Sequence, residues 1–275
     1  MSERPFVDIT PARAAFSVDF TELWQYRELL FLLAWRDATV RYKQSVVGIG
    51  WALIQPLLMM LIFSVVFGRF AGLPSDGVPY PVFSLCALLP WNYFSRSVTD
   101  ASNSLVGSSS LLSKVYFPRL VLPVGKVFSG LIDFAIAFVL LLGVMAWYHV
   151  APSPRAVLLP LFLLIAMLTA FGVGLWLTAL NVKYRDVGFI VPFLVQIWLY
   201  ASPVAYSSAI VPARWKLLYA LNPLVGVVEG FRWALLGRGS FDATSLAVSL
   251  PLVLLLIVSG FWYFHRMERT FADVI

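Results

Sequence analysis

Residues 200–239 read YASPVAYSSAIVPARWKLLYALNPLVGVVEGFRWALLGRG, and they carry three prolines, four basic residues and one acid between two charge-free runs. Proline disfavours helix in the residue before it, so Asn222 and Pro223 predict a break between two short helices, over 215–221 and 224–236. Inside a membrane, non-helical backbone is tolerated only against protein or a water-filled cavity. The stretch therefore favours a broken hairpin at the mouth of a pathway. An amphipathic loop on the membrane surface is the alternative.

The composition places the chain in a membrane. Of its 275 residues 60% are hydrophobic and 12% are charged, and the mean hydropathy is +0.85. An ordinary soluble domain has about 25% charged residues, roughly twice as many. The charge-free runs are long enough to cross about 30 Å of hydrocarbon as helices. We therefore expect an all-α, polytopic membrane protein.

Six transmembrane helices are predicted, over about 50–67, 80–98, 127–147, 156–180, 189–206 and 243–264. A polar arm, 1–19, precedes an amphipathic interface helix over 20–38, which starts at a capping box and places its tryptophans at headgroup depth. Pro90 is expected to break the second span and Pro203 the fifth. A broken, re-entrant hairpin is predicted over about 210–237, between spans five and six. In its second helix, the i, i+3 spacing of Glu229 and Arg232 predicts an ion pair.

Six spans put both termini on one side of the membrane. Residues 1–19 lack the apolar core of a cleavable signal, so we expect both termini in the cytoplasm. The net charge of +6 is then explained by loop residues that set orientation, and not by a nucleic-acid partner. Only the hairpin region violates this positive-inside pattern, with Arg214, Lys216, Arg232 and Arg238. Their charges are expected to serve another purpose than topology.

No catalytic or metal-binding pattern is visible in the sequence. It has no GxxxxGK[ST] motif, so the chain cannot hydrolyse ATP through a P-loop of its own. His149 and His265 are predicted at opposite membrane faces, and no acid pair has the spacing of a metal-dependent transferase. Proton-driven transport would require several intramembrane carboxylates, and the spans contain only Asp133, which we interpret as structural. The single cysteine, Cys86, lies inside a predicted span and excludes an internal disulfide.

Aromatic residues gather where the second and fifth spans are interrupted: Trp91, Tyr93 and Phe94, then Trp198, Tyr200 and Tyr206. Rings with a polar edge stack on the C–H faces of sugars without fixing one register, so they suit a glycan path. The alternative is an interfacial belt that only anchors the spans.

Residues 102–119, SNSLVGSSSLLSKVYFPR, are too polar to span a membrane. They carry a short apolar face at Leu111, Leu112, Val115 and Phe117. This pattern suits a short helix that docks into a partner protein, and the alternative is a surface helix without a partner.

Several motifs carry a family resemblance that covers about residues 20–275. They are WALIQPLLMMLIFSVVFGR at 51–69, LLPWNYFSRSV at 88–98, SLLSKVYFPRLVLPV at 110–124, NVKYRDVGF at 181–189, and the elements SPVAY, NPL and EGFRWALLG of the hairpin region. In these motifs the chain resembles the transmembrane permease subunit of ABC exporters of the ABC-2 type. The resemblance is to the branch that exports O-antigen, capsule or teichoic acid.

The resemblance implies an assembly and a cargo. Two copies of the chain would enclose a channel for a polyprenyl-diphosphate-linked polysaccharide in the bacterial inner membrane. Two copies of a separate ABC ATPase subunit would drive export in a 2:2 complex. ATP and Mg would bind that subunit, and this chain would bind no cofactor or metal of its own.

For an exporter of this kind we predict which residues carry each role. Coupling to the ATPase falls to Lys114, Tyr116, Phe117 and Arg119. The sugar path would use Trp91, Tyr93, Tyr200 and Tyr206. The lipid diphosphate would be received by Arg36, Arg41 and Lys43, because guanidinium and ammonium groups pair with phosphate. The gate hairpin would depend on Asn222, Pro223, Glu229 and Arg232.

Two alternatives stay open at this point. A drug or small-lipid exporter of the same superfamily would share the topology and would have a narrow, apolar channel. A membrane-embedded glycan polymerase or transferase would be active without ATP or a partner, and the missing pair of catalytic carboxylates argues against it.

Overall fold

The computed structural model describes residues 24–43, 48, 50–239 and 241–274. This described part is helical and contains no strand, as expected for an all-α protein. The polar arm 1–19 and the predicted start of the interface helix lie outside the described residues.

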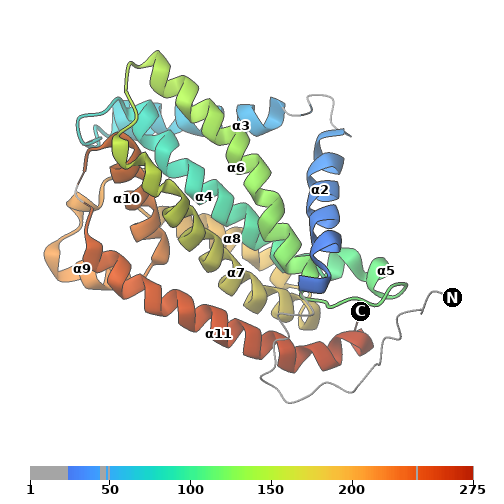
Figure 1. Cartoon of the computed structure of the whole chain (residues 1–275). Helices are drawn as coiled ribbons and strands as arrows, with labels where there is room; N and C mark the ends of the chain where they lie inside the picture. The colour runs from blue at the N-terminus through green and yellow to red at the C-terminus, as the bar shows by residue number, and fades with distance from the viewer. Residues whose placement is uncertain (1–23, 44–47, 49, 240, 275) are drawn as a thin grey trace.

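Most of the described chain lies in a bundle of helices (Figure 1). They are α2 (Arg27–Lys43), α3 (Gly50–Phe63, continued by the π-helix Ser64–Phe70), α4 (Tyr80–Ser102), α6 (Val121–Trp147), α7 (Leu159–Lys183), α8 (Val187–Tyr200) and α11 (Ala243–Val274). Helix α10 (Pro223–Leu236) has 14 residues, as many as α8, whereas α5 (Ser109–Leu112) and α9 (Ala213–Ala220) are shorter.

Four segments of the described chain are long and apolar enough to cross a membrane. They are Gly50–Phe70, Val121–Trp147, Pro154–Lys183 and Ala243–Glu268, and α8 is a shorter apolar helix. The protein is therefore a multi-pass membrane protein. These segments coincide with four of the spans predicted from the charge-free runs.

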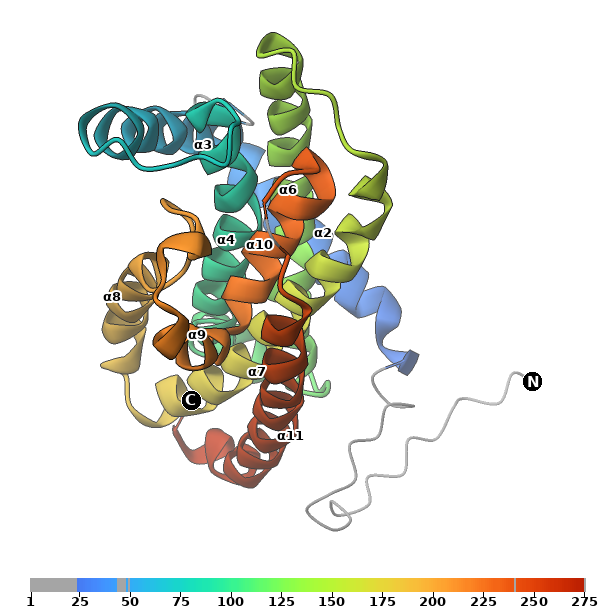
Figure 2. The ribbon, with the colours of Figure 1, turned by 90° about the vertical axis from the view of Figure 1, so that its left-hand side faces the viewer.

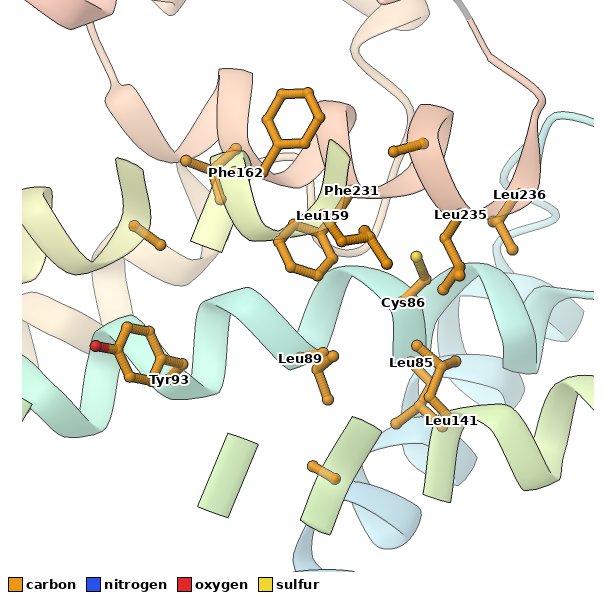
Figure 3. Packing of buried hydrophobic residues seen from close by; sticks show 14 of the residues in the cluster. Leu85, Cys86, Leu89, Tyr93, Leu141, Leu159, Phe162, Phe231, Leu235 and Leu236 are labelled. Atoms are coloured by element: carbon orange, nitrogen blue, oxygen red, sulfur yellow. The ribbon is translucent and has the colours of Figure 1, made fainter. Parts of the chain in front are cut away.

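Helix α4 forms the centre of the bundle, where it packs along α6 and α7. Almost all of its side chains between residues 82 and 94 are buried. In Figure 3, Leu85 of α4 lies next to Leu141 of α6, and Cys86 points towards Leu235 of α10. Protein, and not lipid, surrounds this helix, which is why it can carry the buried serines Ser84 and Ser97.

The predicted break at Pro90 is wrong, because α4 continues through this residue from Tyr80 to Ser102. Proline removes one backbone donor, and the packing of neighbouring helices can hold the remaining hydrogen-bond ladder together. The fifth span does break near its predicted position, since α8 ends at Tyr200, before Pro203.

Helices α6 and α8 run in one direction through the bundle, and α4, α7 and α11 run in the other (Figure 1), whereas α3 lies obliquely at its edge. At one end lie α2, α5 and the C-terminal part of α11. At the opposite end lie α9 and α10, which contact the start of α11. Seen from that end, α3 projects sideways from the bundle (Figure 2). Of the most apolar 18-residue stretch within Gly50–Phe70, only 17% is buried inside the described chain.

Candidate functional site

Asn222 joins three segments at the α9 and α10 end of the bundle. Its Oδ1 atom accepts hydrogen bonds from the backbone nitrogen of Leu224 (3.1 Å) and from Nε1 of Trp198 (2.9 Å). Its Nδ2 group donates to the carbonyl oxygen of Ala201 (3.2 Å) and to Oγ of Ser202 (2.9 Å). The side chain is thus both the N-cap of α10 and a clamp on the end of α8.

Pro223 occupies the first turn of α10, where the missing N–H group has no helical partner to lose. This pair of residues divides the hairpin into α9 and α10, in agreement with the two helices predicted over 215–221 and 224–236. The helix α10 ends at Gly237, whose φ of 67° is the left-handed conformation that glycine readily adopts.

The predicted ion pair between Glu229 and Arg232 is not present in the described hairpin. Arg232 is only 5% exposed, and its guanidinium donates to backbone carbonyl oxygens of the segment that follows α8. Glu229 accepts a hydrogen bond from the backbone of Ser208. It lies in the hairpin between α8 and α11, and burial raises its pKa to about 7, although the charge of Arg232 acts in the opposite direction.

The four aromatic residues predicted for the sugar path fall into two groups. Trp91 and Tyr93 are buried inside the bundle, and the Tyr93 hydroxyl donates to the carbonyl oxygen of Val127 at 3.1 Å. Tyr200 is 59% exposed and Tyr206 is partly exposed, both at the hairpin end. The structure therefore brings only Tyr200 and Tyr206 to an accessible surface of this chain.

Tyr219 of α9 belongs with this second group, although no motif in the sequence indicates it. Its hydroxyl donates to the Tyr206 hydroxyl at 3.0 Å, and the Tyr206 hydroxyl donates to the carbonyl oxygen of Tyr200 at 3.1 Å. Because the partners are 13 and 6 residues apart, no helical or strand spacing could have predicted this cluster.

A charged network occupies the opposite end of the bundle, between α2, α4 and α6. Arg41 of α2 pairs with Asp133 of α6 and with Asp100 of α4, the latter at 3.0 Å. Arg96 of α4 also reaches Asp133, at 3.2 Å. Asp133 is thus shared by two arginines, which agrees with its interpretation as a structural carboxylate.

A second set of ion pairs lies beside this network. Asp37 of α2 pairs with Lys126 of α6 (2.6 Å) and with Arg36 (3.1 Å). An open cavity of about 410 Å³ is lined by Arg36, Asp37, Val40, Arg41, Asp100 and Lys126. Arg36 and Arg41, both predicted to receive a diphosphate, therefore face one cavity, whereas Lys43 is exposed but is not among its lining residues.

The segment predicted to couple to an ATPase is less helical than expected, because α5 ends at Leu112. Lys114 and Tyr116 are exposed, Tyr116 by 72%. Phe117 is buried in a core cluster at this end of the bundle, and the Arg119 guanidinium donates to the carbonyl oxygen of Glu268. Part of the predicted docking face thus packs inside the chain itself.

Comparison with known proteins assigns this arrangement to a family. The sequence model described as ABC-2 type transporter matches residues 28–236. The chain belongs to this family. The matched range contains all of the candidate residues named above, from Arg36 to Arg232.

Relatives of this ABC-2 type chain are similar over nearly their whole length. The O-antigen export system permease protein RfbA of Myxococcus xanthus is 31% identical over 258 residues, which cover 92% of this chain and 98% of that protein. A protein of the same name from Klebsiella pneumoniae is 26% identical, with coverage of 90% and 95%. The polysialic acid transport protein KpsM of Escherichia coli is 24% identical, with coverage of 94% and 98%.

Proposed function

We propose that this ABC-2 type chain is the permease subunit of an ATP-driven exporter of a lipid-linked polysaccharide. The observation that carries the proposal is the end-to-end similarity to relatives whose names state O-antigen export and polysialic acid transport. The helical, multi-pass fold supports it. In this proposal the cargo is a polyprenyl-diphosphate-linked glycan, and the membrane is the bacterial inner membrane with both termini in the cytoplasm.

We propose six transmembrane crossings, by α3, α4, α6, α7, α8 and α11, and the opposite directions of α6 and α8 relative to α4, α7 and α11 support this count. Helix α4 has 23 residues, about 35 Å at 1.5 Å per residue, and its polar groups are covered by protein. Helix α8 has 14 residues, about 21 Å, so it needs the irregular segment after Tyr200 to complete its crossing. The hairpin of α9 and α10 is then the re-entrant element on the periplasmic side.

A homodimer would complete the channel. Apolar side chains remain exposed along α3 and α8, which lie on the same side of the chain in Figure 2. Tyr200 and Tyr206 lie at the hairpin end of this side and are proposed to contact the glycan as it leaves. In the proposal, Trp91 and Tyr93 support the path from within the bundle.

The lipid diphosphate is proposed to bind at the cavity lined by Arg36 and Arg41, and the exposed Lys43, two residues beyond Arg41, is proposed to assist. Arg41 already pairs with Asp100 and Asp133, so a diphosphate oxygen would have to replace a carboxylate on the guanidinium. We expect Arg41→Gln to weaken binding of the lipid-linked glycan more than Lys43→Gln does.

Coupling is proposed to pass through the exposed pair Lys114 and Tyr116, which would contact a separate ABC ATPase subunit that binds ATP and Mg. Phe117 and Arg119 would hold this segment against the core and against α11. A movement of the ATPase subunit would then be transmitted from the exposed Lys114 and Tyr116 to Phe117 and Arg119, and from these residues into the helix bundle.

The test is co-expression and purification of the chain with candidate ABC ATPase subunits of the same organism, followed by ATPase and glycan-export assays. We expect a stable 2:2 complex, in which Tyr116→Ala lowers export and Tyr148→Ala, at an exposed tyrosine of the opposite end, does not. A chain that binds no ATPase and still processes a lipid-linked sugar alone would contradict the proposal and favour an enzyme.

A further inference from the structure

The irregular segment after α8, residues 201–207, leaves backbone carbonyl groups without helical partners. Helix α8 ends at Tyr200, and Pro203 has no N–H group with which to continue the ladder. The residues from Pro203 to Ala205 are buried, so their carbonyl oxygens cannot rely on water. A buried carbonyl without a donor is costly, above all at membrane depth. The segment needs donors from elsewhere in the chain.

Arg232 of α10 supplies most of these donors. Its Nη1 group donates to the carbonyl oxygens of Pro203 (2.6 Å) and Tyr206 (3.1 Å). Its Nη2 group donates to the carbonyl oxygen of Val204 (2.7 Å). One guanidinium therefore binds three of the four consecutive carbonyl groups in 203–206.

Helix α4 completes the arrangement. The Tyr80 hydroxyl donates to the carbonyl oxygen of Ala205, the remaining one of the four. Arg232 is itself held by α4, because its Nε group donates to the carbonyl oxygen of Phe83 at 3.3 Å. The guanidinium carbon also lies 3.5 Å from the centre of the Phe83 ring, a cation–π contact. The segment is thus fixed to α10 and α4 together.

We propose that Arg232 is a positioning residue for the glycan path, because it fixes residues 203–206 and with them the side chain of Tyr206. The inference rests on the proposed function, in which Tyr206 contacts the glycan. The Tyr206 hydroxyl in turn bonds to Tyr219 and to the backbone of Tyr200, so the position of Tyr206 sets that of the whole tyrosine cluster.

The planar guanidinium is essential to this role. Its donors point outward in a fixed fork, so they can reach several carbonyl oxygens and the ring of Phe83 at once. Arg232→Lys keeps the positive charge, but the three N–H donors of lysine all lie on one nitrogen atom. This nitrogen cannot reproduce the fork of the guanidinium, which reaches several carbonyl oxygens at once. Tyr80→Phe removes the single bond to Ala205 and leaves Arg232 in place. Arg238→Lys is the matched control, since Arg238 lies at the same end of the bundle and donates to the carbonyl oxygen of Gly77.

The experiment uses the full chain with its ATPase subunit in membranes and a buried thiol as reporter. Cys86 is replaced by alanine, and Ala205→Cys places one thiol in the segment, at a side chain that is 7% exposed. A membrane-impermeant maleimide then reports how often the segment opens. We expect Arg232→Lys to raise the labelling rate about tenfold and Tyr80→Phe to raise it about threefold to tenfold, from the loss of one or more buried hydrogen bonds. Arg238→Lys should leave it unchanged.

A second readout separates positioning from simple stability, namely the concentration of lipid-linked glycan that half-maximally stimulates ATP hydrolysis. With the native Ala205 restored, Arg232→Lys and Tyr206→Ala should each raise this concentration severalfold. The double variant should raise it no further than Tyr206→Ala alone, because both changes act through one side chain. Additive effects in the double variant would overturn the positioning role.

Unchanged labelling in an Arg232→Lys variant that inserts and assembles normally would also overturn the inference. Tyr80→Phe keeps Arg232 in place, so it still decides the inference if Arg232→Lys fails to accumulate in membranes. If the unsubstituted complex shows no response to the glycan at all, the proposed function fails, whereas the labelling rates still report on the contacts between Arg232 and residues 203–206.

Discussion

The backbones of α7 and α11 approach each other at two glycines, and a single added methyl group should force them apart. A Cβ atom on Gly260 would lie 2.9 Å from the carbonyl oxygen of Gly172. A Cβ atom on Gly172 would lie 3.0 Å from the backbone nitrogen of Ile257. Backbone atoms cannot rotate away as the end of a side chain can. Small residues at such positions allow the close approach of helices in membranes.

The cost follows from these distances. Ordinary contact begins at 3.4 Å, so Gly260→Ala requires a separation of about 0.5 Å. Moving two packed atoms apart by about 0.5–1 Å removes a quarter to a half of their dispersion energy. Overpacking of this kind lowers the free energy of unfolding by ~1–3 kcal/mol. Alanine also has a higher helix propensity than glycine, by about 1 kcal/mol, which a control variant must cancel.

Gly143→Ala is that control, because a Cβ atom on Gly143 of α6 would meet nothing within 4 Å. Both variants gain the same helix propensity, so their difference isolates the contact between α7 and α11. We expect the Tm of Gly260→Ala to lie about 4–8 °C below that of Gly143→Ala, for a difference of ~2 kcal/mol. Thermal unfolding of the purified protein in detergent, followed by tryptophan fluorescence, measures this. Equal Tm values would refute the close approach.

Three further outcomes can be checked in the same preparation. Asn222→Ala should lower the free energy of unfolding by ~1–2 kcal/mol for the lost cap alone, and Tm should show this. Asp133→Asn and Arg41→Gln should each destabilise the protein, and the double variant should lose less than their sum, by ~1–3 kcal/mol in a double-mutant cycle. Glu229 has a pKa raised by burial from 4.5 to about 7, so the folded state holds its proton more tightly and stability falls as pH rises from about 5 to about 7. Glu229→Gln should remove that part of the pH dependence of stability. If the Tm of Glu229→Gln falls with rising pH as steeply as the Tm of the unsubstituted protein, this prediction is wrong.

The sequence alone determined the class of the protein and most of its helices, because these signals are local in the chain. Charge-free runs predicted α3, α6, α7 and α11, and Asn222 with Pro223 predicted the division between α9 and α10. Both kinds of signal act within a few turns of helix, so no tertiary information is needed to use them. Local rules failed at Pro90, where the surrounding helices hold α4 continuous.

Only the tertiary structure decided which polar groups meet. The i, i+3 spacing favoured Glu229 as the partner of Arg232. Arg232 instead binds carbonyl groups 26 to 29 residues away, because the broken end of α8 is brought against it, and the carbonyl group of Phe83, 149 residues away. In the same way, Arg41 meets Asp133 across 92 residues of sequence. A buried charge takes the partners that packing places around it, and packing depends on contacts between segments that no local pattern encodes.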